Sequence, residues 1–397
     1  MHAQVLDFLT RTRARWPDVF GAGRVLECGS YDVNGSPRPL FATATDYVGL
    51  DWRPGPGVDA VSLTHAYTAR PDGYFDTVVS TEMLEHDPHW QASLARMIEL
   101  LMPGGTLLVT CAGPARPAHE LDCGPAGYYH GRTIPELLDY LLALTSWEHV
   151  HAETHSSPAD SYLALVGKQP IRFRPRLSVI IPAVGNVKLT QHCIASLWVT
   201  TPQPYEIILV ENGSRPENRE ALAGLDAEIF LSFDTMLGYP AAVNHGIRLA
   251  SGEYICLLNN DTTQAVTSWS NRLIATLEEM PGAMIVSPVT NFIANPAQRA
   301  EQITAAAPFL ADVLYFVCVV MRRELFATTG LLDESFGLGN CEDAALCRKV
   351  VAAGGKLLVD PGVFVRHVGH ATFGRLPAGM FAKLLQQNQT RLAGLPG

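Results

Sequence analysis

The sequence has no CxxC pair among its eight cysteines, no low-complexity tract, and no apolar run that approaches the about 18 residues of a membrane span. Several cysteines lie inside apolar runs such as residues 254–258, which predicts reduced thiols in the core of a cytosolic protein. The first 20 residues mix basic and acidic side chains and lack the apolar stretch of a signal peptide. These absences favour a globular, cytoplasmic protein without a transmembrane segment.

An excess of positive charge is also missing. Lys and Arg number 29 against 39 Asp and Glu, a formal net charge of −10, and hydrophobic residues make up 47% of the chain. This balance argues against non-specific binding to duplex DNA or anionic lipid, although it leaves room for a local basic groove. The 397 residues exceed the roughly 250–300 that one core usually holds, so we expect two domains.

Short apolar runs alternate with helical patterns, which predicts βα units and mainly parallel sheets with helices on both faces. The expected strands of a first series are residues 25–28, 47–51, 77–80, 106–111 and 162–166. Those of a second series are residues 177–181, 206–210, 228–231, 254–258 and 284–286. Residues 169–176, which contain two prolines and several cationic side chains, predict a linker. We therefore expect two α/β domains, at residues 1–168 and 177–397.

Ligands of open parallel sheets bind at the carboxyl ends of the strands. The first strand ends in VLECGS, with Glu27 and Gly29 at its tip, and the second ends about twenty residues later at Asp51. An acid at that distance suits a ribose, so the pair of strands fits NAD or S-adenosylmethionine. The dinucleotide fingerprint needs further glycines, but Tyr31 and Asn34 stand at those positions, which disfavours NAD.

Residues 20–168 resemble class I S-adenosylmethionine-dependent methyltransferases in the stretches VLECGS, YVGLDW, FDTVVSTEMLEHDPHW and LLMPGGTLLVTCAG. The resemblance implies a Rossmann-like fold with S-adenosyl-L-methionine as cofactor. It also implies that Gly29 lies under the cofactor, Glu27 faces its methionine amino group, Asp51 holds the ribose and Trp52 flanks the adenine.

Methyl transfer to a hydroxyl benefits from a base that removes the proton. His86 follows the expected fourth strand and is the preferred candidate, with His119 and His130 as alternatives. Each histidine alone also fits a plain structural role, such as capping a helix or satisfying a loop carbonyl. We expect no metal ion in this half.

In the second half, three buried strands run into polar tips. Residues 177–183 end at Pro182 and Ala183, residues 206–212 end at Asn212, and residues 254–258 lead into Asn260 and Asp261. A carboxylate at a buried strand end can hold a divalent cation that neutralises a diphosphate. Further along, Glu342 and Asp343 begin a helix, and His367 follows a later strand.

Residues 175–373 resemble an inverting family 2 glycosyltransferase of the GT-A fold, most similar to the rhamnosyltransferase-like branch, because four motifs occur in that family's order and spacing. The resemblance implies that Asp261 and His367 bind Mn²⁺ or Mg²⁺ and that Asp343 is the catalytic base. Further residues are implied to bind substrate, and they are Pro182, Ala183, Asn212, Asn260 and Glu342. Alone, each of these motifs also fits an ordinary turn, helix start or core histidine.

The two resemblances together predict a bifunctional enzyme. One half would transfer a sugar from a nucleotide-sugar donor to an acceptor hydroxyl with inversion, and the other would methylate a hydroxyl, in glycan or cell-surface polysaccharide biosynthesis. Two alternatives remain open. The first half could be a non-catalytic, methyltransferase-like binding module beside an active glycosyltransferase. The acceptor could instead be a protein or a nucleic acid.

Overall fold

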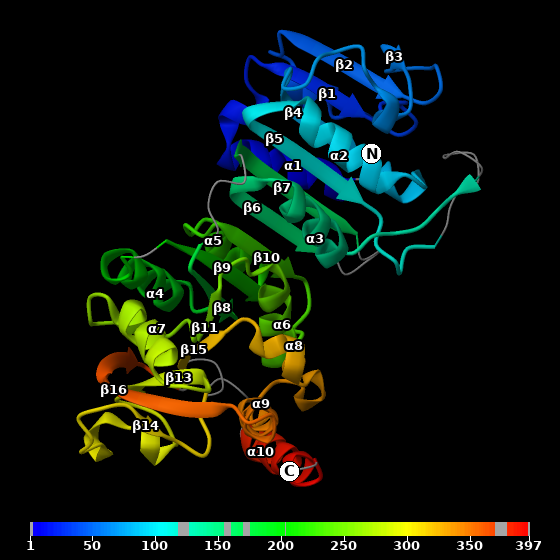
Figure 1. Cartoon of the computed structure of the whole chain (residues 1–397). Helices are drawn as coiled ribbons and strands as arrows, with labels where there is room; N and C mark the ends of the chain where they lie inside the picture. Colours follow the sequence, from blue (N-terminus) through cyan, green and yellow to red (C-terminus); the bar gives the residue numbers. More distant parts are fainter. Residues whose placement is uncertain are drawn as a thin grey trace. The chain divides into compact units, whose positions relative to one another are not determined.

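The structure is a computed structural model that describes residues 3–117, 127–154, 160–169, 175–202, 204–369 and 379–395. The chain divides into two compact units, Met1–Phe173 and Arg174–Gly397, which are coloured blue to teal and green to red in Figure 1. The division falls inside residues 169–176, where the sequence predicts a linker. No helix in the described parts is long and apolar enough to cross a membrane.

The first unit is built on one mixed sheet with the strand order β3-β2-β1-β4-β5-β7-β6. Strands β1 to β5 run parallel to one another, whereas β7 runs antiparallel to both β5 and β6. The strands are β1 (Arg24–Cys28), β2 (Asp46–Asp51), β3 (Ala60–Val61), β4 (Phe75–Thr81), β5 (Leu101–Cys111), β6 (Ser146–Thr154) and β7 (Ser161–Gln169).

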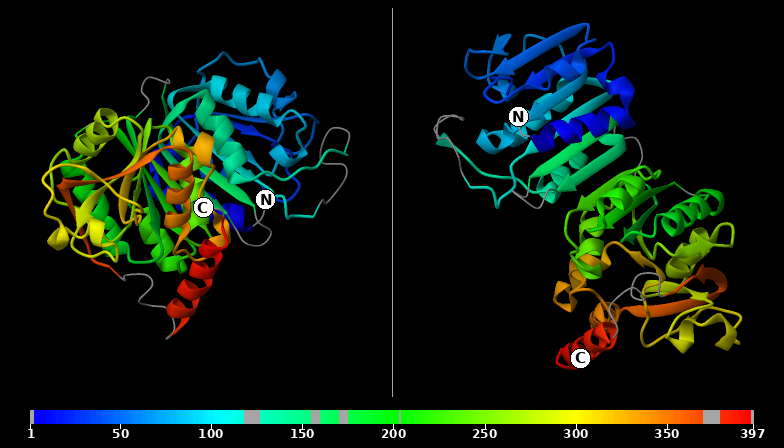
Figure 2. Two further views of the ribbon diagram at one scale, coloured as in Figure 1. Left: turned by 60° about the horizontal axis from the view of Figure 1, so that its bottom comes forward. Right: turned by 180° about the vertical axis from the view of Figure 1, so that it is seen from behind.

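Three helices cover this sheet: α1 (Ala3–Arg15), α2 (Trp90–Leu100) and α3 (Ile134–Leu144). Helix α1 lies on one face and α2 and α3 lie on the other, as the opposite views of Figures 1 and 2 show. Phe8 and Leu9 of α1 pack into a core cluster that includes Leu108 of β5 and Tyr162 of β7. Each helix therefore buries an apolar stripe against the sheet, as an α/β layer requires.

The second unit has a mixed sheet with the strand order β10-β9-β8-β11-β15-β13-β16-β12, and β14 pairs with β16 beside this path. Its strands are β8 (Leu177–Ala183), β9 (Tyr205–Asn212), β10 (Ile229–Phe233), β11 (Tyr254–Leu258), β12 (Thr262–Gln264), β13 (Ala283–Thr290), β14 (Phe309–Leu310), β15 (Cys318–Arg322) and β16 (Lys356–His367). Its helices are α4 (Val187–Thr200), α5 (Pro216–Ala223), α6 (Tyr239–Leu249), α7 (Trp269–Glu279), α8 (Leu325–Thr329), α9 (Glu342–Ala352) and α10 (Met380–Ala393).

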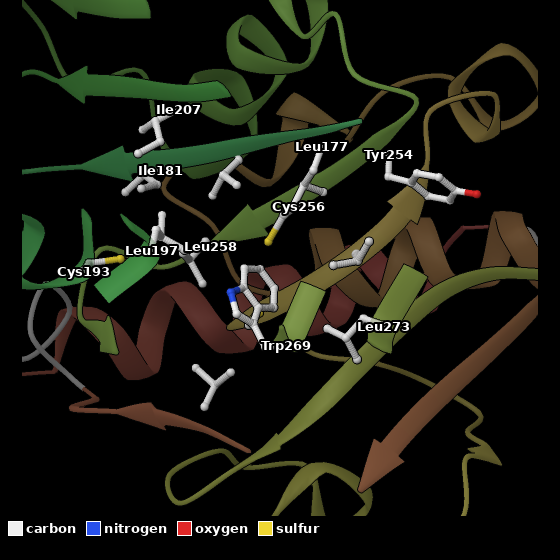
Figure 3. Packing of buried hydrophobic residues seen from close by; sticks show 14 of the residues in the cluster. Leu177, Ile181, Cys193, Leu197, Ile207, Tyr254, Cys256, Leu258, Trp269 and Leu273 are labelled. Carbon is white, nitrogen blue, oxygen red and sulfur yellow. The ribbon is translucent and has the colours of Figure 1, made fainter. Parts of the chain in front are cut away.

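The core of the second unit forms around Trp269, the largest side chain among its fully buried residues. Figure 3 shows its indole between α4 and the sheet, close to Leu197 and Leu258. The indole N–H donates to the hydroxyl of Thr201 at 3.0 Å, so the ring is buried without an unpaired polar atom. This packing fixes α4 and α7 against the strands whose carboxyl ends carry the polar tips.

The prediction of mainly parallel sheets is wrong in part. In the second unit β15 runs antiparallel between β11 and β13, and β12 and β14 run antiparallel to β16. Strand β6 was not expected at all, because its sequence SWEHVHAET mixes charged, aromatic and histidine side chains. Strand direction depends on the route of the chain between strands, which a local apolar pattern does not record.

Candidate functional sites at two strand-order switch points

In the first unit a pocket opens where the strand order reverses. Strands β2 and β3 lie on one side of β1, and the chain then crosses to place β4 on the other side. Such a switch point is where open α/β sheets bind ligands. The pocket holds about 370 Å³ of empty space when the open solvent at its mouth is counted. Its lining residues are Gly29, Asp51, Trp52, Ser62, Leu63, Thr64, Met83, His86 and Asp87.

Gly29 forms the floor of this pocket directly after β1. Its φ of +80° lies in the left-handed region, and a Cβ there would come within 2.7 Å of the Met83 side chain. The Gly29 N–H donates to the carbonyl of Leu50 at 2.8 Å, which ties the turn to β2. Only glycine satisfies both the conformation and the close approach.

Asp51 and Trp52 form the wall at the end of β2. The Asp51 carboxylate accepts hydrogen bonds from the backbone N–H groups of Tyr31 (3.2 Å) and Arg53 (3.1 Å). Burial raises the pKa of Asp51, whereas these two hydrogen bonds lower it. The Trp52 ring is 41% exposed. A fixed carboxylate beside an open aromatic ring can bind a ribose hydroxyl and a flat base.

Glu27 does not have the placement that the resemblance implies, because it is not among the lining residues of the pocket. Its carboxylate accepts hydrogen bonds from the hydroxyls of Tyr47 (2.8 Å) and Ser36 (3.1 Å). Burial raises its pKa to about 7, against the effect of these hydrogen bonds. Its polar partners are therefore inside the protein, and the expected contact with a methionine amino group is not supported.

His86 does line the pocket, in the short 3-10 helix Leu84–His86 that follows β4. It is buried, and its ring meets the ring of Tyr129 edge-on with the centroids 5.1 Å apart. Of the alternatives, His130 donates its backbone N–H to the carbonyl of Glu85 at 2.7 Å, and His119 lies outside the described residues. His86 is thus the candidate base that the structure brings to the pocket.

Sequence reasoning missed Ser62, Leu63, Thr64, Met83 and Asp87 in the pocket lining. The first three follow the two-residue edge strand β3, which is too short to produce an apolar pattern. Asp87 accepts hydrogen bonds from the His89 N–H (2.7 Å) and the Ser93 hydroxyl (2.5 Å), so its carboxylate also contacts the first turn of helix α2.

The second unit has a switch point of the same kind, between β8 and β11. Pro182 and Ala183 are the last two residues of β8 and pair with Val210 and Glu211 of β9. Next to them, Asn212 ends β9, and both the nitrogen and the oxygen of its side-chain amide form hydrogen bonds. The amide donates to the carbonyl of Gly238 at 3.2 Å, and the side-chain oxygen accepts from the N–H of Leu237 at 2.7 Å. Asn212 therefore shapes the turn at residues 237–238.

Asp261 and His367 meet at the edge of the sheet, because β12 pairs antiparallel with β16 and sets Thr262 opposite His367. The Asp261 Oδ1 and His367 Nε2 atoms are 3.2 Å apart, and the Gly369 N–H donates to Asp261 Oδ2, also at 3.2 Å. Both side chains are buried. The structure thus brings together the two residues that the sequence predicts as metal ligands.

The orientation of the His367 ring follows from two residues that sequence reasoning missed. The Nδ1 atom lies 2.7 Å from the carbonyl oxygen of Phe292 and must donate to it, which leaves Nε2 facing Asp261. The carboxamide of Asn291 also holds the backbone of His367 through two hydrogen bonds, at 2.8 and 3.0 Å. Burial lowers the pKa of His367, but the hydrogen bonds to Asp261 and Phe292 leave it raised overall.

A carboxylate oxygen and an oriented imidazole nitrogen are ligands that suit Mn²⁺. Within the described residues, no group of three or more histidine, cysteine or acidic side chains could hold a metal ion. A divalent cation that one or two side chains hold takes its remaining ligands from substrate phosphates and water. Asn260 does not contribute its amide nitrogen, which donates to the Thr190 hydroxyl at 2.9 Å.

Glu342 and Asp343 form the first turn of α9. Burial raises the pKa of Asp343 to about 6, although the backbone N–H groups of Ala344 and Phe316 act in the opposite direction. Burial and the neighbouring charge of Asp343 raise the pKa of Glu342 to about 8. Within the described residues, Glu342 Oε2 has no hydrogen-bond partner. A carboxyl group whose pKa lies near neutrality is suited to proton transfer.

A short path of contacts connects Asp343 to the end of β11. The N–H of Phe316 donates a hydrogen bond to the Asp343 carboxylate. The carbonyl of the next residue, Val317, accepts a hydrogen bond from the N–H of Asn259 at 2.9 Å. Residues 316–317 therefore lie between the start of α9 and the turn that carries Asp261. The candidate base and the candidate metal ligands border the same carboxyl end of the sheet.

Residues 178–330 match the family model described as Glycosyl transferase family 2. The second unit therefore contains a family 2 glycosyltransferase domain on an α/β mixed-sheet fold. The match lies entirely within this unit and includes Asn212 and Asp261, whereas Asp343 and His367 lie beyond its last residue.

Two curated relatives are similar to part of the chain. The O-antigen biosynthesis protein RfbC of Myxococcus xanthus is 29% identical over 196 residues, 43% of this chain and 15% of that protein. The pre-mycofactocin glycosyltransferase of Mycobacterium tuberculosis is 24% identical over 206 residues, 48% of this chain and 42% of that protein. The chain thus spans less than half the length of either relative.

Among solved structures, the mannosyltransferase PcManGT from Pyrobaculum calidifontis, in complex with GDP-Man and Mn²⁺, matches with a TM-score of 0.43 and 17% identity. The match covers 57% of this chain and 66% of that one.

Proposed function

We propose that the second unit is an inverting glycosyltransferase of the GT-A type, which transfers a sugar from a nucleotide-sugar donor to an acceptor hydroxyl. The observation that carries the proposal is the Asp261–His367 pair, at 3.2 Å, in the unit whose residues 178–330 match the family 2 model. Asp261 lies within the match, three residues after β11, and His367 lies beyond it. Asp343, a partly buried carboxylate at the same end of the sheet, supplies the base.

In this mechanism Asp343 accepts the proton of the acceptor hydroxyl while that oxygen attacks the anomeric carbon from the face opposite the diphosphate. The single displacement inverts the configuration. Asp343 acts only when ionised, and its position in the first turn of α9 favours the charged form through the helix dipole. Asp261 and His367 would hold a divalent cation, which when bound offsets the charge that builds on the leaving diphosphate. Asn212 shapes the turn beside the nucleotide.

A direct test is to incubate the purified chain with a panel of nucleotide sugars and Mn²⁺ or Mg²⁺, and to measure release of the nucleoside diphosphate. We expect release with at least one donor, stimulated by a hydroxyl-bearing glycan acceptor. No release from any donor, with a thermal shift by none of them, would reject the proposal. The name of the Myxococcus relative favours polysaccharide acceptors as the first to try.

We further propose that the first unit binds S-adenosyl-L-methionine and methylates a hydroxyl with His86 as base. A specific observation favours it: the pocket at the switch point joins Gly29, Asp51 and Trp52 with His86. Calorimetry with S-adenosyl-L-methionine tests the cofactor, and methylation of a glycosylated product tests the reaction. Binding without methylation of a glycan, protein or nucleic-acid acceptor would leave the unit as a binding module.

A further inference from the structure

The loop that leads into α9 has an unusual backbone. Four of its residues have φ values in the left-handed region: Gly337 (60°), Gly339 (117°), Asn340 (75°) and Cys341 (76°). This region is unfavourable for a residue with a Cβ, and Asn340 and Cys341 directly precede the two carboxyl residues of α9. The conformation of the loop therefore decides where α9 begins and where its first side chains point.

A single side chain from α10 holds this loop. Asn388 is the one buried residue of α10, and its amide group donates to three carbonyl oxygens. These belong to Phe336 (2.9 Å), Gly339 (2.8 Å) and Asn340 (3.1 Å). The Gly339 N–H also donates to the Phe336 carbonyl at 3.2 Å, so Asn388 adds to one backbone hydrogen bond of the loop and supplies a donor to the other two carbonyls.

The remaining contacts of α10 concern the same region. Arg348 of α9 donates to the carbonyl of Leu392 at 2.7 Å, and the Arg391 guanidinium lies 5.9 Å from the centre of the Phe336 ring. Figure 1 shows α10 (red) next to α9. Helix α10 is thus attached to the loop and the helix that carry the candidate base.

The loop also buries polar atoms that lack partners. In the described part of the chain, neither Glu342 Oε2 nor Asn340 Nδ2 has a hydrogen-bond partner. Backbone strain together with buried unpaired polar groups is a combination that concentrates at binding sites. A donor nitrogen and a carboxyl oxygen would both be satisfied by a hydroxyl-bearing ligand such as a sugar.

We propose that Asn388 is a positioning residue, which fixes Asp343 for proton transfer by holding the loop of residues 336–341, four of which are left-handed. The inference rests on the proposed glycosyl transfer, in which Asp343 is the base. It assigns a part in that reaction to α10, a helix some 40 residues further along the chain than Asp343.

The test compares full-length Asn388→Asp with Gln389→Ala, an exposed change on the same helix. The aspartate has nearly the same size but cannot donate to the three carbonyls. We expect kcat to fall about tenfold or more with the donor KM within twofold, whereas Gln389→Ala keeps both constants. The acid limb of the kcat profile should also move towards the ordinary carboxyl range, because a released Asp343 is less buried. The titratable groups whose charges interact with Asp343 are Glu342, Tyr239, Tyr315, Cys341 and Cys347.

Two further variants guard against simple unfolding. Cys341→Gly, added to Asn388→Ala, should restore at least a third of the lost kcat, because glycine adopts a positive φ without penalty. Arg348→Ala changes an exposed side chain and weakens only the attachment of α10, so we expect a folded protein with a several-fold lower kcat.

Hydrogen exchange tests, without any enzymatic turnover, whether Asn388 holds the loop of residues 336–341. We expect faster exchange of residues 336–345 in Asn388→Asp and not in Gln389→Ala. The inference would be overturned if Asn388→Asp and Gln389→Ala exchange at the same rate. It would also be overturned if the wild type transfers sugar and Asn388→Asp has the same kcat. If Asn388→Asp exchanges faster but the wild type transfers no sugar from any donor, the proposed function is rejected and the hold of Asn388 on the loop is not.

Discussion

The two units place their candidate sites at the same kind of position but build them from different side chains. In both, the first three strands extend to one side and the fourth lies on the other side of the first. The pocket of the first unit combines a glycine turn and an exposed indole with His86 and with two carboxylates, Asp51 and Asp87, that accept hydrogen bonds from backbone N–H groups. The site of the second unit consists of two ionisable pairs, Asp261 with His367 and Glu342 with Asp343, in which all residues but Asp343 are buried.

This difference indicates how each site would recognise its ligand. A pocket shaped by backbone and aromatic surface binds through fit and a few directed hydrogen bonds. A site made of buried charges must be completed by a cation, a proton or a polar ligand, because unpaired buried charge is costly. We therefore expect substitutions in the second unit to act mainly on rate and those in the first mainly on affinity.

The largest effect is expected from Asp343→Asn. The amide cannot accept the proton, so sugar transfer should fall by about 10²–10⁴-fold, the usual contribution of a general base. Transfer kinetics measure this, and binding of S-adenosyl-L-methionine to the first unit should not change. Asp312→Asn, an exposed change in the same unit, is the control. Near-normal transfer by Asp343→Asn would remove the residue from the mechanism.

Removal of the cation should come next. Chelation of Mn²⁺ or the Asp261→Ala change should lower transfer by about 100-fold or more, since a cation contributes several kcal/mol of charge stabilisation. Added Mn²⁺ should restore the chelated wild type but not the variant. If transfer proceeds at full rate in a chelator, the Asp261–His367 pair has another role.

In the first unit we expect a substitution to change the affinity for S-adenosyl-L-methionine. We expect Asp51→Ala to weaken binding of S-adenosyl-L-methionine by about 10–100-fold, as for loss of a hydrogen bond to a charged group. Calorimetry measures the dissociation constant, with the exposed Asp72→Ala as the matched control. The same affinity in both variants would contradict a ribose contact at Asp51.

The pH dependence of transfer should sharpen the contrast. Asp343 must be ionised, and its pKa is about 6, so kcat should fall about tenfold per unit below that pH.

The stability of the second unit should depend on pH in the opposite direction. The folded state retains the proton of Glu342 up to about pH 8, so stability from this group falls as pH rises. Glu342→Gln should therefore gain stability relative to wild type between pH 5 and 8, as thermal unfolding can measure.

The smallest effects concern two glycines of the first unit that share a φ of +80°. Alanine at Gly104 meets no atom within 4 Å and should cost only the conformational penalty of about 1–2 kcal/mol. Alanine at Gly29 also clashes with Met83 and should cost about 1–3 kcal/mol more. Urea unfolding of the two variants measures the difference. Equal free energies of unfolding would mean that the turn at Gly29 relaxes easily.

The apolar strands and their polar tips could be read from the sequence because both features are local. The run at residues 254–258 is β11 with the predicted bounds, and Asp261 and His367 do lie together. The pocket includes Gly29, Asp51, Trp52 and His86 as predicted. The pocket residues follow from one rule, that side chains after parallel strands share an edge of the sheet, whereas the Asp261–His367 contact depends on the antiparallel pairing of β12 with β16.

The rest depends on contacts between distant segments. The partners of Glu27 are Tyr47 and Ser36, and neither carries a signal that would tie it to that carboxylate. The orientation of His367 depends on Phe292, 75 residues earlier in the chain. The three carbonyls that Asn388 binds lie in a loop whose backbone strain leaves no periodic pattern in the sequence. Side-chain hydrogen bonds of this kind become visible only when the packing is known.

One contact between two turns connects Asn212, at the end of β9, to the loop before α9. A Cβ on Gly238, in the turn that Asn212 holds, would come within 2.0 Å of the carbonyl oxygen of Gly337, in the loop before α9. The two backbones touch with no side chain between them. Under the proposed function, a substitution that moves the turn at residues 237–238 would therefore also displace the loop that precedes Asp343.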